Sequence, residues 1–374
     1  MSSERRPLVI VALGIAVLAV VVFLATRGTS SPPQATPGAS PTTSGATTDG
    51  PSQEPSPGAS ESASAVPSTE PIALTVGLGF ISSVQFAPFY RADQAGYYEE
   101  AGLDVTFQNK IDPDLITLVG QGSVDVGLAD GTSVIPAVSQ GIPIKYVATI
   151  YGQFPSIVFA KTSSGIATAA DLEGKKLGIP GRFGSSWIML QALLASAELT
   201  PEDLEIVEYP DFGQGAAVTQ GAVAAATGFA NNEPVQLGLT GEAVTVLRVD
   251  DVVPLPGNGL IVGQETLETK SDAVAAFIAA TLRAMVEISA EPEVGLEAAI
   301  TAVPELGSAR ETQAAILAAT IDVWNGPIQE TNGLGAIEPT DWEASITYLE
   351  GLGLVPNPVT VDDVLETGLL PGAN

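Results

Sequence analysis

Residues 75–105 read TVGLGFISSVQFAPFYRADQAGYYEEAGLDV, and this stretch decides the fold. Residues 75–80 form a short apolar run interrupted by glycines, which predicts a β-strand. A helix is predicted to follow as far as Gly102, and residues 103–105 begin a second strand. An open α/β sheet places its ligand where a strand ends in polar and aromatic side chains. The turn after the first strand carries such side chains at Ser82, Ser83, Gln85, Phe86, Phe89 and Tyr90.

The alternation of strands and helices continues downstream. The second of the next strands ends at Asp130, whose carboxylate can accept hydrogen bonds from ring N–H groups, and Thr132 can donate at the start of the following helix. Both residues can equally act as helix caps, and one position can serve both roles. The third strand ends at Tyr151 and Gln153, which complete the candidate ligand residues of this half. These predicted strands cover residues 103–108, 124–129 and 144–150.

A glycine-rich turn at residues 180–186 leads into a predicted helix from Trp187. Free backbone N–H groups at a helix start suit an anionic or carbonyl-bearing ligand edge, and Ser185 and Ser186 lie in this turn. Arg182 can bind a carboxylate or phosphate, or it can form a surface ion pair. Trp187 can stack on a flat ring, or it can pack in the core. The strands predicted around this turn cover residues 156–161, 177–179, 204–209, 226–229 and 245–248.

Two asparagines and an acidic residue follow the strand predicted at residues 226–229. Asn231 and Asn232 can present a donor and an acceptor together, which an amide- or pyrimidine-like edge requires, and Glu233 follows them. Asparagine and proline residues also simply form turns. The position at a strand end favours ligand contact for at least one of the two asparagines.

The last third of the chain is predicted to be helical. Residues 271–289 have apolar side chains at helical spacing, with Ser271 as the N-cap. Core packing is the interpretation that we adopt for this tail. Its further helices are predicted at residues 293–302, 309–324, 340–352 and 361–365.

Histidine and cysteine are both absent from the 374 residues. The absence of cysteine excludes disulfides, thiolate metal sites and a cysteine nucleophile. The absence of histidine excludes the usual zinc sites and Ser-His-Asp triads. We therefore predict a protein that is not an enzyme and has no metal and no cofactor. The net charge of −29 predicts a surface that repels nucleic acid and anionic lipid head groups.

The N-terminal region predicts export. Residues 8–25 are an unbroken apolar run, preceded by Arg5 and Arg6 and followed by Arg27. This length is just sufficient to cross a bilayer, and the preceding charges predict a cytoplasmic N-terminus. Residues 1–27 are therefore a signal anchor or a cleaved signal peptide, and the long apolar run favours the anchor. Residues 28–71 are rich in Ser, Thr, Pro and Gly and predict a disordered linker.

Several segments resemble the periplasmic-type substrate-binding proteins of ABC importers. They are VQFAPFY (84–90), GYYEEAGLDV (96–105), DVGLAD (125–130), IPIKYVA (142–148), DLEGKKLG (171–178) and NEP (232–234). The most similar branch takes sulfonates, thiamine pyrimidine precursors or riboflavin, and the riboflavin-binding members look most alike. The resemblance covers residues 72–374.

The resemblance implies a two-lobed α/β fold of the type II periplasmic-binding-protein kind with two crossover segments. Lobe one is then formed by residues 72–160 and 261–374, and lobe two by residues 161–260. It also implies a membrane-tethered extracytoplasmic receptor that closes on a small molecule and docks on an ABC permease. A pyrimidine synthase shares this fold, but it depends on histidine and on a cysteine-rich motif, which this chain lacks.

The expected site collects the candidate side chains from both lobes. It is rich in aromatic rings and carboxamides and holds a single cation, which favours a flat heterocycle with N–H and C=O groups. We rank riboflavin first, a thiamine pyrimidine precursor second and an alkanesulfonate third. The expected ligand residues are Ser83, Gln85, Phe86, Tyr90, Asp130, Thr132, Tyr151, Gln153, Arg182, Ser185, Ser186, Trp187, Asn231, Asn232 and Glu233.

Overall fold

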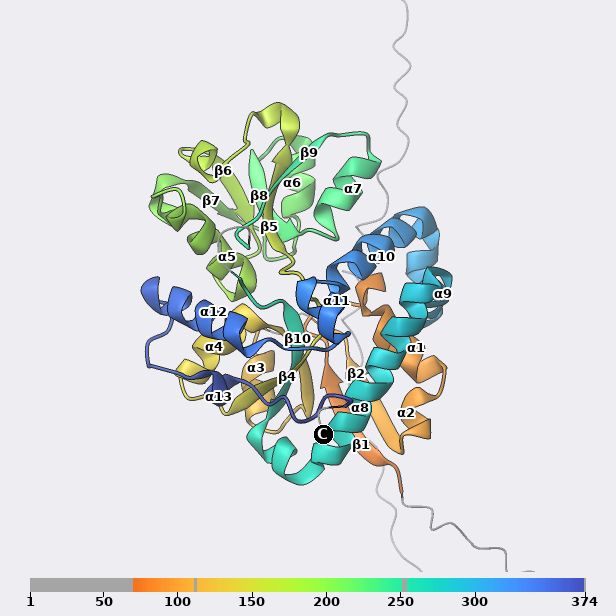
Figure 1. Cartoon of the computed structure of the whole chain (residues 1–374). Helices are drawn as coiled ribbons and strands as arrows, with labels where there is room; N and C mark the ends of the chain where they lie inside the picture. Colours follow the sequence, from red (N-terminus) through yellow and green to blue (C-terminus); the bar gives the residue numbers. More distant parts are fainter. Residues whose placement is uncertain (1–69, 111–112, 251–253, 373–374) are drawn as a thin grey trace, which may run out of the picture. The chain divides into compact units, whose positions relative to one another are not determined.

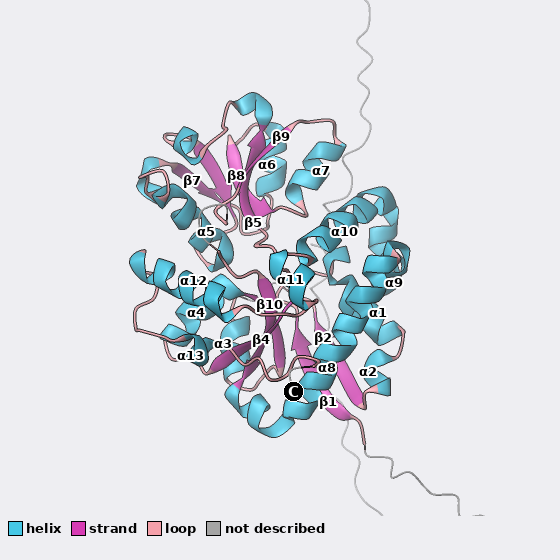
Figure 2. Cartoon of the chain, viewed as in Figure 1, coloured by secondary structure: helices cyan, strands magenta, loops and turns pink. Residues whose placement is uncertain are grey.

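The computed structural model describes residues 70–110, 113–250 and 254–372. The predicted signal segment, and the predicted linker as far as residue 69, lie outside the described residues. The described residues form two α/β lobes, each built on its own five-stranded sheet (Figure 1). Figure 2 shows the two sheets as separate groups of strands with helices around them.

The first sheet belongs to lobe one. Its strands are β1 (Ile72–Gly77), β2 (Leu103–Gln108), β3 (Val126–Asp130), β4 (Ile144–Thr149) and β10 (Asn258–Gly263). Their order is β2-β1-β3-β10-β4. β1 runs parallel to β2 and β3, whereas β10 runs antiparallel to both of its neighbours. The strands β2 and β5 have the same bounds as predicted, because each is an apolar run between clear turn signals.

The second sheet belongs to lobe two and repeats the same plan. Its strands are β5 (Ser156–Lys161), β6 (Lys176–Ile179), β7 (Glu205–Glu208), β8 (Ala225–Phe229) and β9 (Val244–Leu247). Their order is β7-β6-β8-β5-β9, with β6 parallel to β7 and β8. β5 runs antiparallel to both β8 and β9. In each sheet the antiparallel strand is the one that the chain enters directly from the other lobe.

The lobe boundaries differ from the expected ones by a few residues at each crossing. β5 pairs within the second sheet from Ser156, so residues 156–160 belong to lobe two rather than to lobe one. β10 pairs within the first sheet from Asn258, so residues 258–260 belong to lobe one. The reason is that each crossover leads at once into a strand of the next sheet. The segment DLEGKKLG leads into β6, the second strand of lobe two along the chain.

The two crossovers are bonded to each other. Arg248, on the second crossover, donates from Nη2 to the carbonyl oxygen of Phe154 on the first crossover at 2.8 Å. The amide of Tyr151 donates to the carbonyl oxygen of Asn258 at 2.9 Å. Both connections between the lobes therefore lie side by side, as in a hinge.

Helices connect and cover the strands. Lobe one contains α1 (Ala87–Gln94), α2 (Tyr97–Glu100), α3 (Leu115–Gly120) and α4 (Gly131–Ser139). Lobe two contains α5 (Gly184–Ala195), α6 (Gln214–Gln220) and α7 (Glu233–Leu239). The helical tail contains α8 (Gln264–Ala290), α9 (Pro292–Ala302), α10 (Arg310–Trp324), α11 (Pro327–Asn332), α12 (Pro339–Gly351) and α13 (Val361–Val364).

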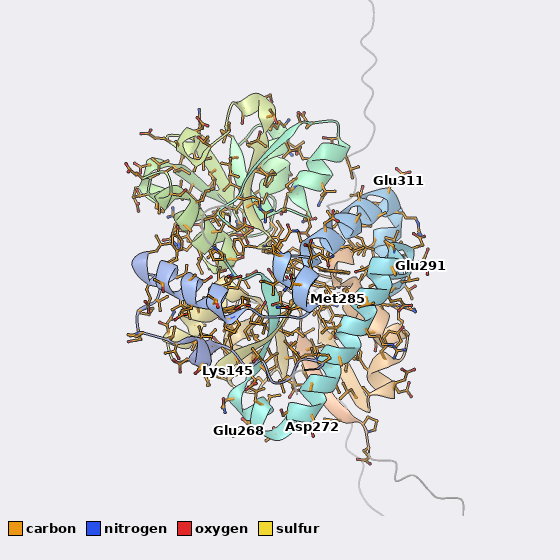
Figure 3. The ribbon with its side chains drawn as sticks, in the orientation of Figure 1. Lys145, Glu268, Asp272, Met285, Glu291 and Glu311 are labelled. Carbon is orange, nitrogen blue, oxygen red and sulfur yellow. The ribbon has the colours of Figure 1, made fainter. Side chains whose placement is uncertain are left out.

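The long helix α8 is a core helix of lobe one. Its backbone departs from helical geometry at Lys270, directly before the predicted N-cap Ser271. Figure 3 shows Met285 among the packed side chains, whereas Asp272 lies at the edge of the molecule. Among the described residues it is the one helix with the length and hydropathy of a membrane span, but 56% of its most apolar window is buried in the fold. The rings of Tyr98 and Phe277 stack in this core, with their centroids 5.0 Å apart.

Candidate functional site

The carboxyl ends of the parallel strands in the two sheets face each other. Residues that follow β1 and β3 in lobe one contact residues that follow β6, β7 and β8 in lobe two. We call this region the lobe interface. Among the described residues, the pairs that cross it include Gln85 with Asn231, Asp130 with Ser185, and Phe80 with Phe212.

Asn231 belongs to the lobe interface and is fully buried. Its Nδ2 donates to Gln85 Oε1 at 2.9 Å and to Thr320 Oγ1, on α10, at 2.9 Å. The hydroxyl of Tyr151 donates to the same Gln85 Oε1 at 3.4 Å. One carboxamide of lobe two therefore joins the turn after β1 and the helical tail, both of which belong to lobe one.

Asp130 places a buried carboxyl group at the same interface. Although it stands at the N-cap position of α4, its side chain makes no capping hydrogen bond, so its carboxyl group is directed elsewhere. Burial raises the pKa of Asp130 to about 6, against the opposing effect of the Ser185 hydroxyl and amide and the Asn258 side chain. Burial, assisted by the Asp130 charge, also raises the pKa of Tyr146 and Tyr151.

Several polar atoms of this interface are buried without a hydrogen-bond partner. Leaving such an atom unpaired costs about 1–3 kcal/mol, so most buried polar atoms in proteins are paired. A group of unpaired atoms at facing strand ends therefore indicates a place prepared for another molecule. Among the residues that the structure describes, these atoms include Asp130 Oδ1, Thr132 Oγ1, Ser133 Oγ, Asn231 Oδ1 and Asn258 Oδ1.

A second group of unpaired atoms follows β1 and β2. Tyr90 is buried, and its hydroxyl has no hydrogen-bond partner within the described part of the chain. Burial raises the pKa of Tyr90, while Ser82, the Ser83 backbone and Asn109 lie beside the hydroxyl and act in the opposite direction. Asn109 Oδ1 is also buried and unpaired.

Two of the expected ligand residues in this turn make contacts within lobe one. The hydroxyl of Ser83 accepts a hydrogen bond from the Gln85 amide at 3.3 Å and thereby caps the short 3-10 helix η1 (Val84–Phe86). Phe86 is buried in the core of lobe one. Gln85 is the residue of this turn that reaches across to lobe two.

Three other expected ligand residues have bonds within their own surroundings. Gln153 donates from Nε2 to the carbonyl oxygens of Asp322 and Asn325, which ties the first crossover to the end of α10. Asn232 Oδ1 accepts from Gln236, one turn further along α7. Glu233 accepts from the amide of Phe229 at 2.8 Å, and burial raises its pKa. These bonds stabilise the crossover and the start of α7, and the ligand role of the three side chains stays a prediction.

The glycine-rich turn divides into a buried and an exposed part. Ser185 is buried in the first turn of α5, and its hydroxyl accepts from Ser156 at 3.0 Å. Ser186 follows it and is half-buried. Arg182 pairs with Glu208 at 3.2 Å, and its guanidinium lies 5.2 Å from the ring centroid of the half-buried Trp187. Arg182 therefore makes the surface ion pair that was one of its two expected roles.

Replacing Arg182 with alanine is expected to change the free energy of unfolding by less than about 1 kcal/mol, because half-exposed ion pairs contribute little. Arg248 offers a matched control, since it is mostly buried and bonds both Asp250 and the Phe154 carbonyl. Arg248→Ala is expected to cost about 2 kcal/mol. Urea denaturation of both variants measures these values. An equal loss of unfolding free energy in Arg182→Ala and Arg248→Ala would contradict the assignment of Arg182 to a surface ion pair.

Sequence reasoning missed four residues of the lobe interface. Thr320 lies in a helix whose sequence pattern indicates only core packing, so the pattern did not indicate a role at the interface. Asn258 stands between two glycines at the start of β10. A polar residue between two glycines beside a strand is a pattern from which Asn258 could have been predicted as a site residue. The aromatic pair Phe80 and Phe212 joins residues far apart in sequence, which no local pattern reveals.

Comparison with known proteins identifies relatives along most of the chain. The profile of the family described as NMT1/THI5 like matches residues 83–294. The riboflavin-binding protein RibY of Chloroflexus aurantiacus is 32% identical over 315 residues, which cover 82% of this chain and 89% of RibY. The 4-amino-5-hydroxymethyl-2-methylpyrimidine phosphate synthase of Legionella pneumophila is 28% identical and covers 62% of this chain and 74% of that enzyme.

The fold is shared with solved binding proteins. The periplasmic aliphatic sulphonate binding protein SsuA of Escherichia coli superposes with a TM-score of 0.62 at 19% identity, and the match covers 80% of this chain and 99% of SsuA. This likeness confirms the predicted two-lobed periplasmic-binding-protein fold for the described lobes. The profile match extends over more than half of the chain, and the identity to RibY over most of it. The chain therefore belongs to the NMT1/THI5-like family.

Proposed function

We propose that this chain is an extracytoplasmic solute-binding receptor. It captures a small heterocyclic vitamin or vitamin precursor, with riboflavin favoured, between its two lobes and delivers it to an ABC permease. The observation that carries this proposal is the group of buried, unpaired polar atoms at the lobe interface. Asp130, Thr132 and Asn258 contribute from lobe one, and Asn231 contributes from lobe two.

The chemistry of these atoms favours a heterocycle. The carboxylate of Asp130 and the carbonyl oxygens of Asn231 and Asn258 are acceptors, which suit ring N–H groups. The hydroxyl of Thr132 can donate to a ring carbonyl. Arg182, the one cation among the expected ligand residues, pairs with Glu208 instead, which argues against a ligand held by its negative charge. The likeness to RibY over 82% of the chain supports the same ligand class.

A binding role is favoured over catalysis. Some relatives are named as pyrimidine phosphate synthases. The present chain contains no histidine and no cysteine, so the most common acid–base and nucleophilic side chains are missing. The asparagine and aspartate oxygens of the interface that have no hydrogen-bond partner among the described residues suit recognition of a small molecule.

Ligand exchange requires the lobes to separate, because Asn231 is fully buried in the closed arrangement. The two adjacent crossovers are the natural hinge for this motion. In this proposal the apolar residues 8–25 tether the receptor to the membrane, with the lobes on the extracytoplasmic side, where the permease takes up the ligand.

Titration of the full chain with riboflavin tests the proposed ligand. We expect the flavin emission to be quenched at a stoichiometric ratio, because the ring of Tyr151, whose hydroxyl bonds Gln85 at the lobe interface, can stack on a flavin. Arg182→Ala, as the matched control, should quench to the same extent. Unchanged flavin emission would exclude riboflavin. Thermal-shift assays with 4-amino-5-hydroxymethyl-2-methylpyrimidine and with the sulfonate MOPS would then separate the two other ligand classes.

A further inference from the structure

An aromatic pair also crosses the lobe interface. Phe80 follows β1 in lobe one, and Phe212 follows β7 in lobe two. Their ring centroids are 5.0 Å apart, and the rings meet edge to face with an interplanar angle of 77°. Both side chains are only partly buried. The contact exists only while the lobes are closed, because its two partners belong to different lobes.

Phe212 is held in an unusual backbone conformation. Its φ is 59°, and it is one of two non-glycine residues with positive φ within residues 70–110, 113–250 and 254–372. Its amide donates to the Tyr209 carbonyl, and the Gly213 amide donates to Asp211 Oδ1, which defines the turn. Glycine would adopt this turn without strain. A bulky side chain at such a position indicates that the ring itself serves a function.

Unpaired polar atoms lie near both rings along the chain. On the side of lobe one, Phe80 precedes Ser82, which lies beside the unpaired hydroxyl of Tyr90 and the unpaired Asn109 Oδ1. On the side of lobe two, Phe212 precedes Gln214, whose Oε1 is buried and unpaired. Apolar ring faces therefore occur close in sequence to hydrogen-bonding groups that have no partner among the described residues.

The geometry points to Phe80 and Phe212 as ligand-binding residues. We infer that they form an aromatic clamp that packs on a flat ring of the ligand, while Tyr90 and Asn109 bond its polar edge. The two rings contact each other when the site is empty, and they part to admit the ligand. Asn109 Oδ1 accepts, so the bound edge carries an N–H or O–H donor. This inference rests on the proposed function and specifies its ligand as a flat heterocycle.

The test compares ring-deleting variants in the full chain. Phe212→Gly removes the ring and the backbone strain, Phe212→Ala removes the ring and keeps much of the strain, and Phe80→Ala removes the partner ring. Phe183→Ala is the matched control, since Phe183 is a half-exposed phenylalanine of lobe two with no ring contact among the described residues. The probes are riboflavin, 4-amino-5-hydroxymethyl-2-methylpyrimidine and MOPS, each measured by titration calorimetry.

We expect each ring deletion to weaken binding of the flat heterocycle at least about tenfold, while Phe183→Ala leaves it unchanged. Phe212→Gly should unfold at a higher urea concentration than Phe212→Ala and still show the same loss of affinity. That pattern assigns the effect to the ring and not to the turn. Full affinity of Phe212→Gly for a flat heterocycle would overturn the clamp and leave the receptor function standing.

Two further outcomes bear on both proposals. Binding of MOPS alone would contradict the flat-ring ligand and the clamp together, but it would retain a solute receptor. Failure of the wild-type chain to bind any of the three probes would count against the proposed ligand class and the clamp alike.

Discussion

Replacing Asp130 with asparagine is expected to stabilise the empty protein at pH 7 by up to about 3 kcal/mol. The folded protein raises the pKa of Asp130 from 3.8 to about 6, so holding it ionised at pH 7 costs free energy of about this size. Asparagine has nearly the same shape and no charge, and it can still accept from Ser185 or Asn258. The same substitution is expected to weaken ligand binding about tenfold or more, because a neutral acceptor replaces a carboxylate.

The pH dependence follows from the direction of this shift. Between about pH 4 and pH 6 the folded protein binds the Asp130 proton more tightly than the unfolded chain does. The contribution of Asp130 to stability is therefore greatest below this window and is lost as the pH rises through it. Urea denaturation at several pH values should show this decline in the wild-type chain and its absence in Asp130→Asn.

Asp125→Asn is the matched control for this experiment. Asp125 pairs with Lys270 at 2.7 Å and accepts from the Thr75 amide at 2.8 Å. Loss of that charge should destabilise the protein at pH 7, whereas Asp130→Asn should stabilise it. Destabilisation by Asp130→Asn at pH 7 would contradict the interpretation of Asp130 as a carboxylate kept for a ligand. Opposite effects on stability and binding are characteristic of functional residues.

Replacing Asn231 with alanine is expected to lower the free energy of unfolding by about 2 kcal/mol and to weaken ligand binding at least about tenfold. The reason is the loss of two hydrogen bonds from one buried carboxamide, to Gln85 and to Thr320. These bonds join lobe two to lobe one. Their loss therefore destabilises the closed arrangement of the lobes as well as the folded state. Urea denaturation and titration with riboflavin measure the two effects.

The neighbouring Asn232 provides the control for Asn231. Its side chain is partly exposed and bonds Gln236 within the same helix, so Asn232→Ala should cost less than about 1 kcal/mol. Equal losses of unfolding free energy and of ligand affinity in Asn231→Ala and Asn232→Ala would contradict a role for the buried carboxamide in joining the lobes or binding the ligand. Both variants remove an asparagine side chain from adjacent positions. A difference between them therefore measures the effect of burial and of the contact between the lobes.

Local sequence patterns predicted strands better than the ends of helices. The helix α6 ends at Gln220, where Gly221 adopts a left-handed conformation with φ 73°. The run of alanines beyond it has no periodicity that separates a helix from the strand β8, so the boundary could not be read from the pattern. The helix α5 begins at Gly184 rather than at Trp187, which brings Ser185 into its first turn.

The location of the candidate site was predictable, but its individual contacts were not. Strand ends marked Gln85, Asp130 and Asn231, because polar residues there have no place in a sheet. The choice between Asn231 and Asn232 depends on which side chain turns toward α10, a helix about 90 residues further along the chain. Such a contact is set by tertiary packing, and local propensity carries no information about it.

The order of strands in the first sheet has a consequence for how the chain folds. Within that sheet β4 pairs with β10 alone, and β10 is made only after all strands of lobe two. During synthesis β4 therefore waits for a partner while the contiguous residues 156–247 can complete their own sheet. Joining β4 to β10 closes a long loop, which slows this step unless lobe two is already compact. The lobe that begins first is thus the one completed last.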